Sequence, residues 1–215
     1  MTTNHKIAVF GGTGKAGIYL IKTLLSQGYA IGMLLRNPAK AADYNHPQIE
    51  IITGTVSDPD AVDTLLKGCT AVISTLGMGN PPSNPDIFTR STQHILQAME
   101  RYQLRRYILI TGLNVDTPTD RKGSEATAGT AWMKAHFPVS TENKQQEYEL
   151  LSRSALDWTM VRLPRIEQSD ELQDICIDLE DCPGSSISAT SLARFLIGQI
   201  EVDTYYRKAP FVADR

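Results

Sequence analysis

Cysteine is scarce in this chain of 215 residues: only Cys69, Cys176 and Cys182 are present, and no two of them form a closely spaced pair. Because this set is odd and sparse, the pattern predicts free thiols and not a disulfide framework. The four histidines are scattered along the chain as well. Without a recognisable Cys/His ligand spacing, we expect no metal site.

Long hydrophobic runs are missing too. No stretch of about eighteen apolar residues occurs, so the sequence predicts no membrane-spanning helix. The residues before the first apolar stretch do not have the character of a secretory signal, and we expect a cytoplasmic protein. The net charge of -3 provides no overall attraction to nucleic acid or to an acidic membrane, so we expect neither as a partner.

The chain instead has an alternation of short apolar, β-branched runs with longer stretches of helical periodicity. Predicted strands cover residues 7–10, 30–35, 49–52, 71–74, 107–110 and 158–162, with weaker ones at 175–179 and 211–212. Predicted helices cover residues 16–27, 58–67, 86–102, 141–153 and 188–200. This order predicts an α/β fold: one doubly wound parallel sheet over 1–215 (a Rossmann fold), with strand order 3-2-1-4-5-6, helices on both faces and a small C-terminal substrate lobe.

One long segment, residues 112–140, has no clear periodicity and is predicted to be irregular. Long irregular segments in a compact domain are usually functional, so we expect 112–140 and 164–187 to form the substrate side of the site. Trp132 and Phe137 would either stack on a flat substrate or pack the segment onto the body of the protein. His136 lies between them and is a candidate proton donor. The acidic run 167–180 is expected to be a solvated rim.

A glycine motif lies between the first predicted strand and the first predicted helix. Gly11, Gly14 and Gly17 have the GxxGxxG spacing, which permits a sharp turn, close approach of a pyrophosphate and tight packing of the helix on the sheet. Amide groups at the start of this helix would face the phosphates. The predicted phosphate-binding residues are Gly11, Thr13, Gly14, Lys15, Ala16 and Gly17. The alternative is a tight turn that binds nothing.

Arg36 follows the second predicted strand, where a site that prefers NAD usually has an acidic residue for the ribose 2′-hydroxyl. A guanidinium group suits a 2′-phosphate, and Lys15 adds a second positive charge. The sequence therefore favours NADP(H) over NAD(H) as the cofactor. The alternative is that Arg36 is a solvated surface residue.

Five stretches carry a family resemblance: GGTGKAG, LLRNPAK, GTVSDPDAV, AVISTLG and ALDWTMVRLPRI. Together they resemble the atypical short-chain dehydrogenase/reductase family, in particular its NAD(P)H-binding proteins similar to flavin reductase/biliverdin reductase B and to NmrA-like sensors. The resemblance implies that Thr55 and Val56 lie near the adenine. It also implies that the ribose and nicotinamide are lined by Ser74, Thr75, Leu76, Gly77, Leu163 and Pro164. Asp58 is interpreted mainly as a helix N-cap.

The catalytic positions of that family are only partly preserved. Classical members use serine, tyrosine and lysine, the last two spaced YxxxK. The resemblance places Lys144 at the lysine, Thr111 at the serine and Ser140, which is a poor acid, at the tyrosine. The alternatives without a catalytic role are a solvated Lys144, an ordinary strand-end hydroxyl at Thr111 and a surface salt bridge at Glu147.

The missing tyrosine favours hydride transfer from NADPH to a flat acceptor that needs little acid from the protein, such as a flavin or a quinone. It is equally compatible with a non-catalytic NADP(H)-binding redox sensor. An NADP-dependent isomerase or dehydratase is a weaker alternative because it would need the absent acid. The expected partner is a small-molecule electron acceptor, and the protein is expected to be a monomer or a homodimer.

Overall fold

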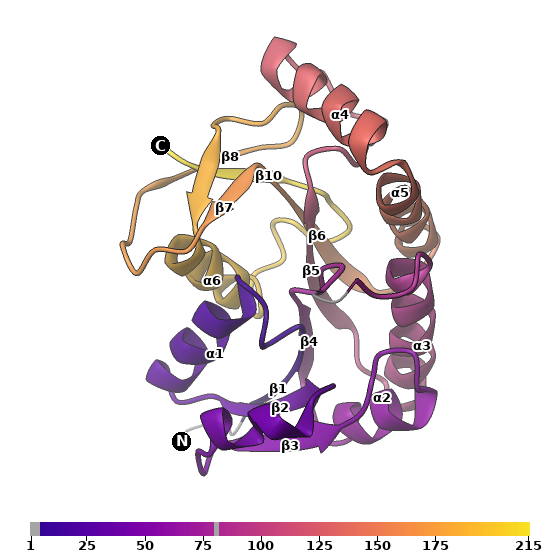
Figure 1. Cartoon of the computed structure of the whole chain (residues 1–215), viewed down its shortest axis with the longest axis vertical. Helices are drawn as coiled ribbons and strands as arrows, with labels where there is room; N and C mark the ends of the chain where they lie inside the picture. Colours follow the sequence, from indigo (N-terminus) through magenta and orange to yellow (C-terminus); the bar gives the residue numbers. More distant parts are fainter. Residues whose placement is uncertain (1–4, 80–81) are drawn as a thin grey trace.

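The computed structural model describes residues 5–79 and 82–215 (Figure 1). The first four residues therefore lie outside the description, as do two residues of the Gly-, Asn- and Pro-rich segment 77–85. The strands are β1 (Lys6–Phe10), β2 (Ala30–Leu35), β3 (Ile49–Thr53), β4 (Ala71–Ser74), β5 (Arg106–Gly112), β6 (Asp157–Leu163), β7 (Arg165–Glu167), β8 (Ile175–Asp178), β9 (Ser186–Ser188) and β10 (Phe211–Asp214). The helices are α1 (Gly17–Ser26), η1 (Pro38–Tyr44, a 3-10 helix), α2 (Pro59–Leu66), α3 (Ile87–Arg101), α4 (Ser124–His136), α5 (Pro138–Ser152) and α6 (Ala189–Gly198).

An eight-stranded sheet has the order β3-β2-β1-β4-β5-β6-β10-β8. All pairs from β3 to β10 are parallel, and only β8 runs antiparallel to its neighbour. The predicted doubly wound sheet and the order 3-2-1-4-5-6 are thus confirmed, with two strands added at the far edge. The chain reverses its direction of winding between β1 and β4, which is where ligands bind in folds of this kind.

The central strand β1 shows why the helices form two layers. Ile7 and Val9 point to the core under α1 and α6, whereas Ala8 and Phe10 point to the core under α2, α3 and α5. Side chains alternate between the two faces of a strand, so a strand that is apolar at every position must be covered on both sides. Figure 1 shows this division, with α1 and α6 on one side of the sheet and α2, α3 and α5 on the other.

The prediction of an irregular segment at 112–140 is wrong. Residues 124–136 form α4, and α5 begins at Pro138. The sequence pattern hid α4 because only Ala126 and Thr130 on it are buried, so an apolar stripe is absent. Alanine-rich composition supports the helix instead. Figure 1 shows α4 projecting at one end of the molecule, away from the body of the sheet.

Beyond β6 the chain forms a small two-stranded parallel sheet from β7 and β9, which periodicity did not predict. Each of these strands has three residues, too few for an alternating pattern to be recognised. Within residues 5–79 and 82–215, no helix combines the length and apolar character that crossing a bilayer requires.

Candidate functional site: a dinucleotide cavity

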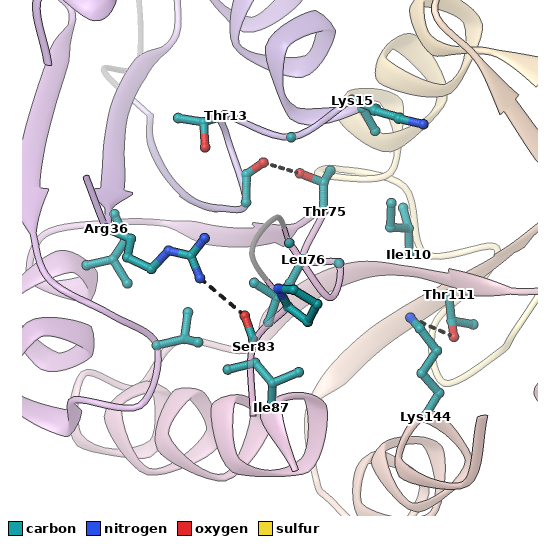
Figure 2. Close-up of a pocket in the computed structure, with 18 of the residues that line it drawn as sticks. Thr13, Lys15, Arg36, Thr75, Leu76, Ser83, Ile87, Ile110, Thr111 and Lys144 are labelled. Carbon is teal, nitrogen blue, oxygen red and sulfur yellow. Dashed lines mark hydrogen bonds between the residues drawn. The ribbon is translucent and has the colours of Figure 1, made fainter. Parts of the chain in front are cut away.

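A cavity of about 980 Å³ opens at the carboxyl ends of the parallel strands (Figure 2). Its volume lies at the upper end of the ordinary range for small-molecule sites, roughly 300–1,000 Å³. Of the residues predicted to hold the dinucleotide, all line this cavity except Gly17 and Ser74. The fold therefore brings together residues from β1, β2, β4, β5, β6 and α5 that are distant in the sequence.

The glycine loop has two kinds of glycine. Gly11 has a φ of +76°, and a Cβ on it would lie 2.6 Å from the carbonyl oxygen of Thr75. A Cβ on Gly17 would lie 2.1 Å from the carbonyl oxygen of Gly11, so the turn itself requires a glycine there. Gly14 differs, because a Cβ there would meet only the Gly11 carbonyl oxygen, at 3.2 Å. Since Gly14 lines the cavity, the space beside it is open to a ligand.

The first turn of α1 faces the cavity without a side-chain cap. Ala16 stands at the N-cap, no side chain accepts from the first amides, and no acidic residue lies in the first turn. The partial positive charge at a helix N-terminus is therefore not compensated by the protein itself. Together with the open face of Gly14, this arrangement suits a phosphate group.

Thr75 joins the end of β4 to the glycine loop. Its backbone amide donates to the carbonyl of Phe10 at 2.9 Å, and its hydroxyl lies 3.2 Å from the carbonyls of both Phe10 and Gly11. Figure 2 shows Thr75 reaching the loop in this way. The hydroxyl of the neighbouring Ser74 instead accepts from the amide of Leu76, at 3.4 Å. Ser74 therefore shapes the loop but does not line the cavity, contrary to the sequence-based expectation.

The end of β2 supplies positive charge. Arg36 lines the cavity, and its Nη1 donates to the Ser83 hydroxyl at 3.4 Å, across the cavity mouth (Figure 2). Lys40, on η1, lines the same region and was missed by the sequence analysis, although the RNPAK stretch contains it. Asn37 begins η1 by accepting from the Ala39 amide at 3.0 Å, and Lys40 lies in the first turn of this helix.

The cavity is strongly one-sided in charge. Among the described residues that line it, four are basic and none is acidic: Lys15, Arg36, Lys40 and Lys144. A cleft lined by charges of a single sign concentrates ligands of the opposite sign. The site therefore suits an elongated polyanion such as a dinucleotide.

The wall formed by 54–57 is held from behind by α2 and α3. Asp58 accepts from the amides of Asp60 and Ala61 and so caps α2, as the sequence analysis interpreted it. The carbonyl of Val56 pairs with Nδ1 of His94 at 2.9 Å. His94 thus fixes the backbone of a cavity residue, a role that the sequence offered no signal for.

At the other end of the cavity lie Thr111 and Lys144. Nζ of Lys144 is 3.4 Å from the Thr111 hydroxyl and 4.0 Å from the centre of the Phe88 ring. Lys144 is half-buried against Thr111 and Phe88, so the interpretation of it as a solvated surface residue is wrong. Apolar side chains surround this end: Ile110, Leu163, Pro164 and Ile166.

The two remaining catalytic candidates do not line the cavity. Ser140 is half-buried near the start of α5 and reaches no cavity residue. His136 is exposed at the end of α4, where its Nδ1 pairs with the carbonyl of Trp132 and its ring stacks on the Trp132 ring at 4.5 Å. Trp132 and Phe137 are 53% and 50% exposed. Trp132 and Phe137 therefore neither cover the cavity nor pack onto the body of the protein. Like His136, they lie at the exposed end of α4.

The helix that carries Lys144 is held against α3 by the adjacent residue Asn143. The side-chain oxygen of the buried Asn143 accepts from the amides of Phe88 and Thr89, at 2.9 and 3.3 Å, and its nitrogen donates to the Thr89 hydroxyl. These bonds satisfy open amides at the start of α3 and clamp α5 to α3. Asn143 was not predicted, since one asparagine in a helix is no signal by itself.

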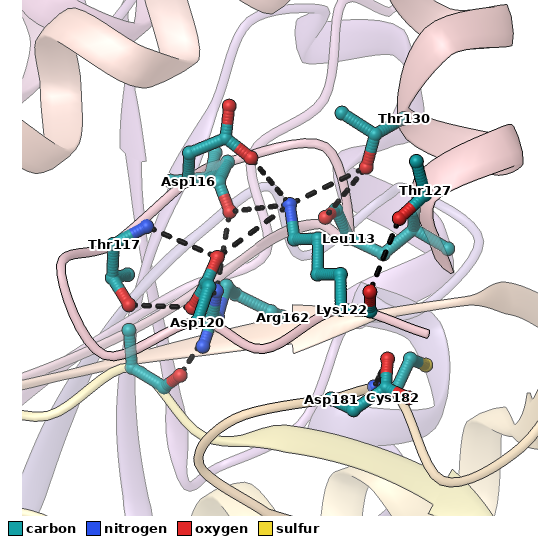
Figure 3. A network of polar contacts seen from close by, with 12 residues as sticks. Leu113, Asp116, Thr117, Asp120, Lys122, Thr127, Thr130, Arg162, Asp181 and Cys182 are labelled. Carbon is teal, nitrogen blue, oxygen red and sulfur yellow. Dashed lines mark hydrogen bonds and ion pairs between the residues drawn. The ribbon is translucent and has the colours of Figure 1, made fainter. Parts of the chain in front are cut away.

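A second polar network holds the chain between β5 and α4 (Figure 3). Arg162 is fully buried and donates to Asp120 at 2.6 Å and to the carbonyls of Val115, Leu179 and Ala209. Lys122 adds an ion pair with Asp116 at 2.6 Å. Burial lowers the pKa of Arg162, while the paired Asp120 opposes that shift. Arg162 does not line the cavity, and its contribution is to anchor the segment that follows Thr111.

Three features are typical of a dinucleotide-binding Rossmann protein: the glycine loop between β1 and α1, the uncapped start of α1, and a cavity whose charged residues, among those described, are all basic. The chain belongs to the NAD(P)H-binding family, whose sequence pattern matches residues 11–203. It is 24% identical to the photosystem II assembly factor Ycf39 of Cyanophora paradoxa over 97% of this chain and 64% of that protein. The chain thus spans slightly less than two thirds of the length of this relative.

Solved structures share the whole fold. A short-chain dehydrogenase/reductase of Veillonella parvula in complex with NADP is 17% identical, with a TM-score of 0.80 over 98% of this chain and 94% of that one. ChuY of Escherichia coli O157:H7, an anaerobillin reductase, is 16% identical, with a TM-score of 0.80 over 97% of both chains. At such identities the likeness establishes the fold, and the chemistry must be argued from the site.

Proposed function

We propose that this protein is an NADPH-dependent reductase that transfers a hydride to a flat acceptor such as a flavin or a quinone. The observation that carries the proposal is the composition of the cavity: four cations and no carboxylate among its described lining residues. Three of the cations suit the phosphates, and the fourth lies at the apolar end. At that end the Thr111 hydroxyl and the Lys144 amine line the cavity as polar side chains.

The preference for NADP(H) is part of the same proposal. Arg36 and Lys40 both line the cavity near the end of β2, with no acidic residue among the described lining. A carboxylate there would accept from a ribose 2′-hydroxyl and repel a 2′-phosphate, whereas two cations attract it. The 2′-phosphate would compete with Ser83 for the Arg36 guanidinium, since these two residues are 3.4 Å apart.

When bound, the dihydronicotinamide supplies a hydride, which leaves an oxidised cofactor and an acceptor with one added negative charge that a solvent proton neutralises. The chain's own part is to bind and orient. The Lys144 ammonium donates hydrogen bonds to oxygens of the ribose or of the acceptor, and Thr111 holds that ammonium in place. Ile110, Leu163 and Ile166 exclude water from the face of a flat ring.

The type of acceptor follows from what the site lacks. No tyrosine is among the described cavity residues, so the standard acid for an alkoxide is missing. Reduced flavins and hydroquinones are far stronger acids than alcohols, and their anions need less help from the protein. An acceptor of that kind therefore fits the site better than an aldehyde or a ketone.

The test is oxidation of NADPH followed by absorbance, with FMN, menadione and an aldehyde offered separately. We expect turnover with FMN or menadione and little with the aldehyde. Turnover with the aldehyde alone would contradict the proposed acceptor class. Absence of NADP+ binding in calorimetry would contradict the whole proposal.

A second candidate is a non-catalytic NADP(H)-binding protein that passes a signal to a partner. Two observations favour it: the absent tyrosine, and the likeness to relatives that are photosystem II assembly factors. It predicts tight NADP(H) binding without NADPH oxidation by any acceptor of the panel. The same two assays therefore distinguish the candidates.

A further inference from the structure

Lys144 places a cation in the apolar end of the cavity without an ion-pair partner. Among residues 5–79 and 82–215, no carboxylate lies within ion-pair distance of it, and its amine contacts the Thr111 hydroxyl and the Phe88 ring. Burial lowers the pKa of Lys144, and the nearby charge of Glu147 opposes that shift. The charge of this amine therefore depends on Glu147, three residues further along α5.

Glu147 is buried, with only 4% of its surface exposed. The sequence-based interpretation of it as half of a surface salt bridge is therefore wrong. Its Oε1 accepts a hydrogen bond of 2.7 Å from the hydroxyl of Thr92 on α3. Thr92 is fully buried. A buried carboxyl with one hydroxyl donor and no ion-pair contact is costly to ionise, so its ionisation state is sensitive to the few charged groups near it.

The groups that face Glu147 come from three elements. Lys144 faces it from α5 and Thr92 from α3, while β5 contributes Tyr107. The Tyr107 hydroxyl is buried without a hydrogen-bond partner among the described residues. Burial, and then the Glu147 charge, raise the pKa of Tyr107 above its usual value, so this phenol stays neutral. Lys144 is therefore the cationic group that the Glu147 charge acts on.

We infer that Glu147 is a positioning residue that sets the charge Lys144 presents to the ligand cavity. The two residues are three apart on one helix, so their side chains lie on the same face of α5, between the cavity and α3. Lys144 contacts the cavity, whereas Glu147 lies behind it and acts only through Lys144. The inference rests on the proposed function in one respect, namely that the ligand lies against Thr111 and Lys144.

The net charge of the pair formed by Lys144 and Glu147 depends on pH. Burial raises the pKa of Glu147 to about 7, while Lys144 and Thr92 lower it. Above that pH the ionised carboxyl supports the Lys144 ammonium, and the pair has no net charge. Below it the carboxyl is neutral, and the cavity end carries a net positive charge. An acceptor that becomes an anion on taking up a hydride is therefore stabilised more strongly below neutral pH.

The direct experiment is competitive acetylation of lysines with acetic anhydride, quantified peptide by peptide by mass spectrometry. It needs no cofactor and no turnover. Only the neutral amine reacts, so the rate reports the pKa of Lys144. At about pH 8 we expect Glu147→Gln to raise the labelling of Lys144 roughly three- to tenfold, because removal of the supporting charge lowers its pKa. The exposed Lys67 serves as an internal reference.

Two matched variants complete the design. Glu149→Gln removes an equal charge from an exposed position of the same helix and should leave Lys144 labelling unchanged. Thr92→Val removes the donor to the carboxyl, which makes Glu147 harder to ionise, so a smaller rise is expected near pH 7. The difference between wild type and Glu147→Gln should shrink below about pH 6, where the side chain at position 147 is neutral in both proteins. If Glu147→Gln does not fold, Thr92→Val still tests the inference.

Equal labelling of Lys144 in wild type, Glu147→Gln and Thr92→Val would overturn the inference. NADP+ then serves as a separate probe: protection of Lys144 from acetylation by NADP+ supports the proposed function, and its absence contradicts it. Unchanged labelling with protection would reject the role of Glu147 alone. Raised labelling without protection would reject the proposed ligand position while leaving the electrostatic coupling intact.

Discussion

The amine of Lys144 meets the hydroxyl of Thr111 at 3.4 Å, across the gap between α5 and the end of β5. This contact joins two positions that are 33 residues apart in the sequence, and it places the only lysine of α5 at the apolar end of the cavity. The chemistry of the proposed function depends on this contact, and so does the first prediction below.

Replacement of Lys144 by methionine keeps the alkyl stem over Phe88 but removes the ammonium. We expect kcat/KM for NADPH oxidation to fall about 10- to 100-fold, the value of one hydrogen bond from a charged group, roughly 1.5–3 kcal/mol. Steady-state kinetics measures this, and Lys67→Met, at an exposed position on the C-cap of α2, is the control. Rates equal to wild type would mean that Lys144 does not contact the reacting ligands.

Reversal of charge at Arg36 tests the 2′-phosphate assignment. Arg36→Asp should weaken NADP+ binding about 10- to 100-fold and leave NAD+ binding equal or stronger, because a carboxylate repels the phosphate but accepts from a 2′-hydroxyl. Lys40→Ala should act in the same direction with a smaller effect. Calorimetry with NADP+ and with NAD+ measures the two dissociation constants, and their ratio gives the cofactor preference. An unchanged preference in Arg36→Asp would exclude this residue from the phosphate site.

The glycine loop allows stability and binding to be separated. Gly17→Ala forces a Cβ to within 2.1 Å of a backbone oxygen, so the thermal midpoint should fall by roughly 5–10 °C. Gly14→Ala has no comparable clash and should unfold near the wild-type temperature. Its affinity for NADP+ should fall at least about tenfold, because the added methyl group would occupy the place proposed for a phosphate. Scanning fluorimetry and calorimetry measure the two effects.

Gly198→Ala is the matched control for both glycine variants, since a Cβ at this exposed position of α6 would meet no atom within 4 Å. It should leave affinity unchanged and stability unchanged or slightly raised. Normal NADP+ affinity in Gly14→Ala would show that the open face of the loop does not receive a phosphate.

The raised pKa of Glu147 predicts a pH dependence of folding stability. The carboxyl has an ordinary pKa of 4.5 and a pKa of about 7 in the folded protein, so between these values the native state holds a proton that the unfolded chain has lost. Its contribution to stability is therefore complete below about pH 4.5 and declines as pH rises to about 7. Over this range the free energy of unfolding should fall by about 3 kcal/mol.

Denaturant unfolding from about pH 5 to pH 8 checks this dependence. Glu147→Gln should lack the decline and be more stable than wild type at pH 8, whereas Glu149→Gln should follow the wild-type curve. Parallel curves for wild type and Glu147→Gln would mean that Glu147 ionises at its ordinary pKa. Each variant is compared at a fixed pH, so that the titration of the many surface groups cancels.

The sequence by itself determined the sheet, the order of its first six strands and the glycine loop that lines one end of the cavity. These features are local: an apolar run that alternates between two faces, a helical period, and a glycine motif between them. A turn such as that at Gly11 has the same backbone requirement wherever it occurs, so its spacing can be interpreted without the rest of the chain. The positive charge of Arg36 at the end of β2 could be predicted for the same reason, because its position directly after a strand is a local feature of the sequence.

Only the tertiary structure decided the other end of the cavity. It carried His136 and Trp132 out to the surface on α4, a helix with too few buried residues to leave an apolar pattern. It also buried Glu147 against Thr92 and used Asn143 to cap a helix that begins 56 residues earlier. Whether a polar residue on an amphipathic helix meets water or a buried partner depends on which helix packs against it. That choice is made by long-range packing and has no local signature.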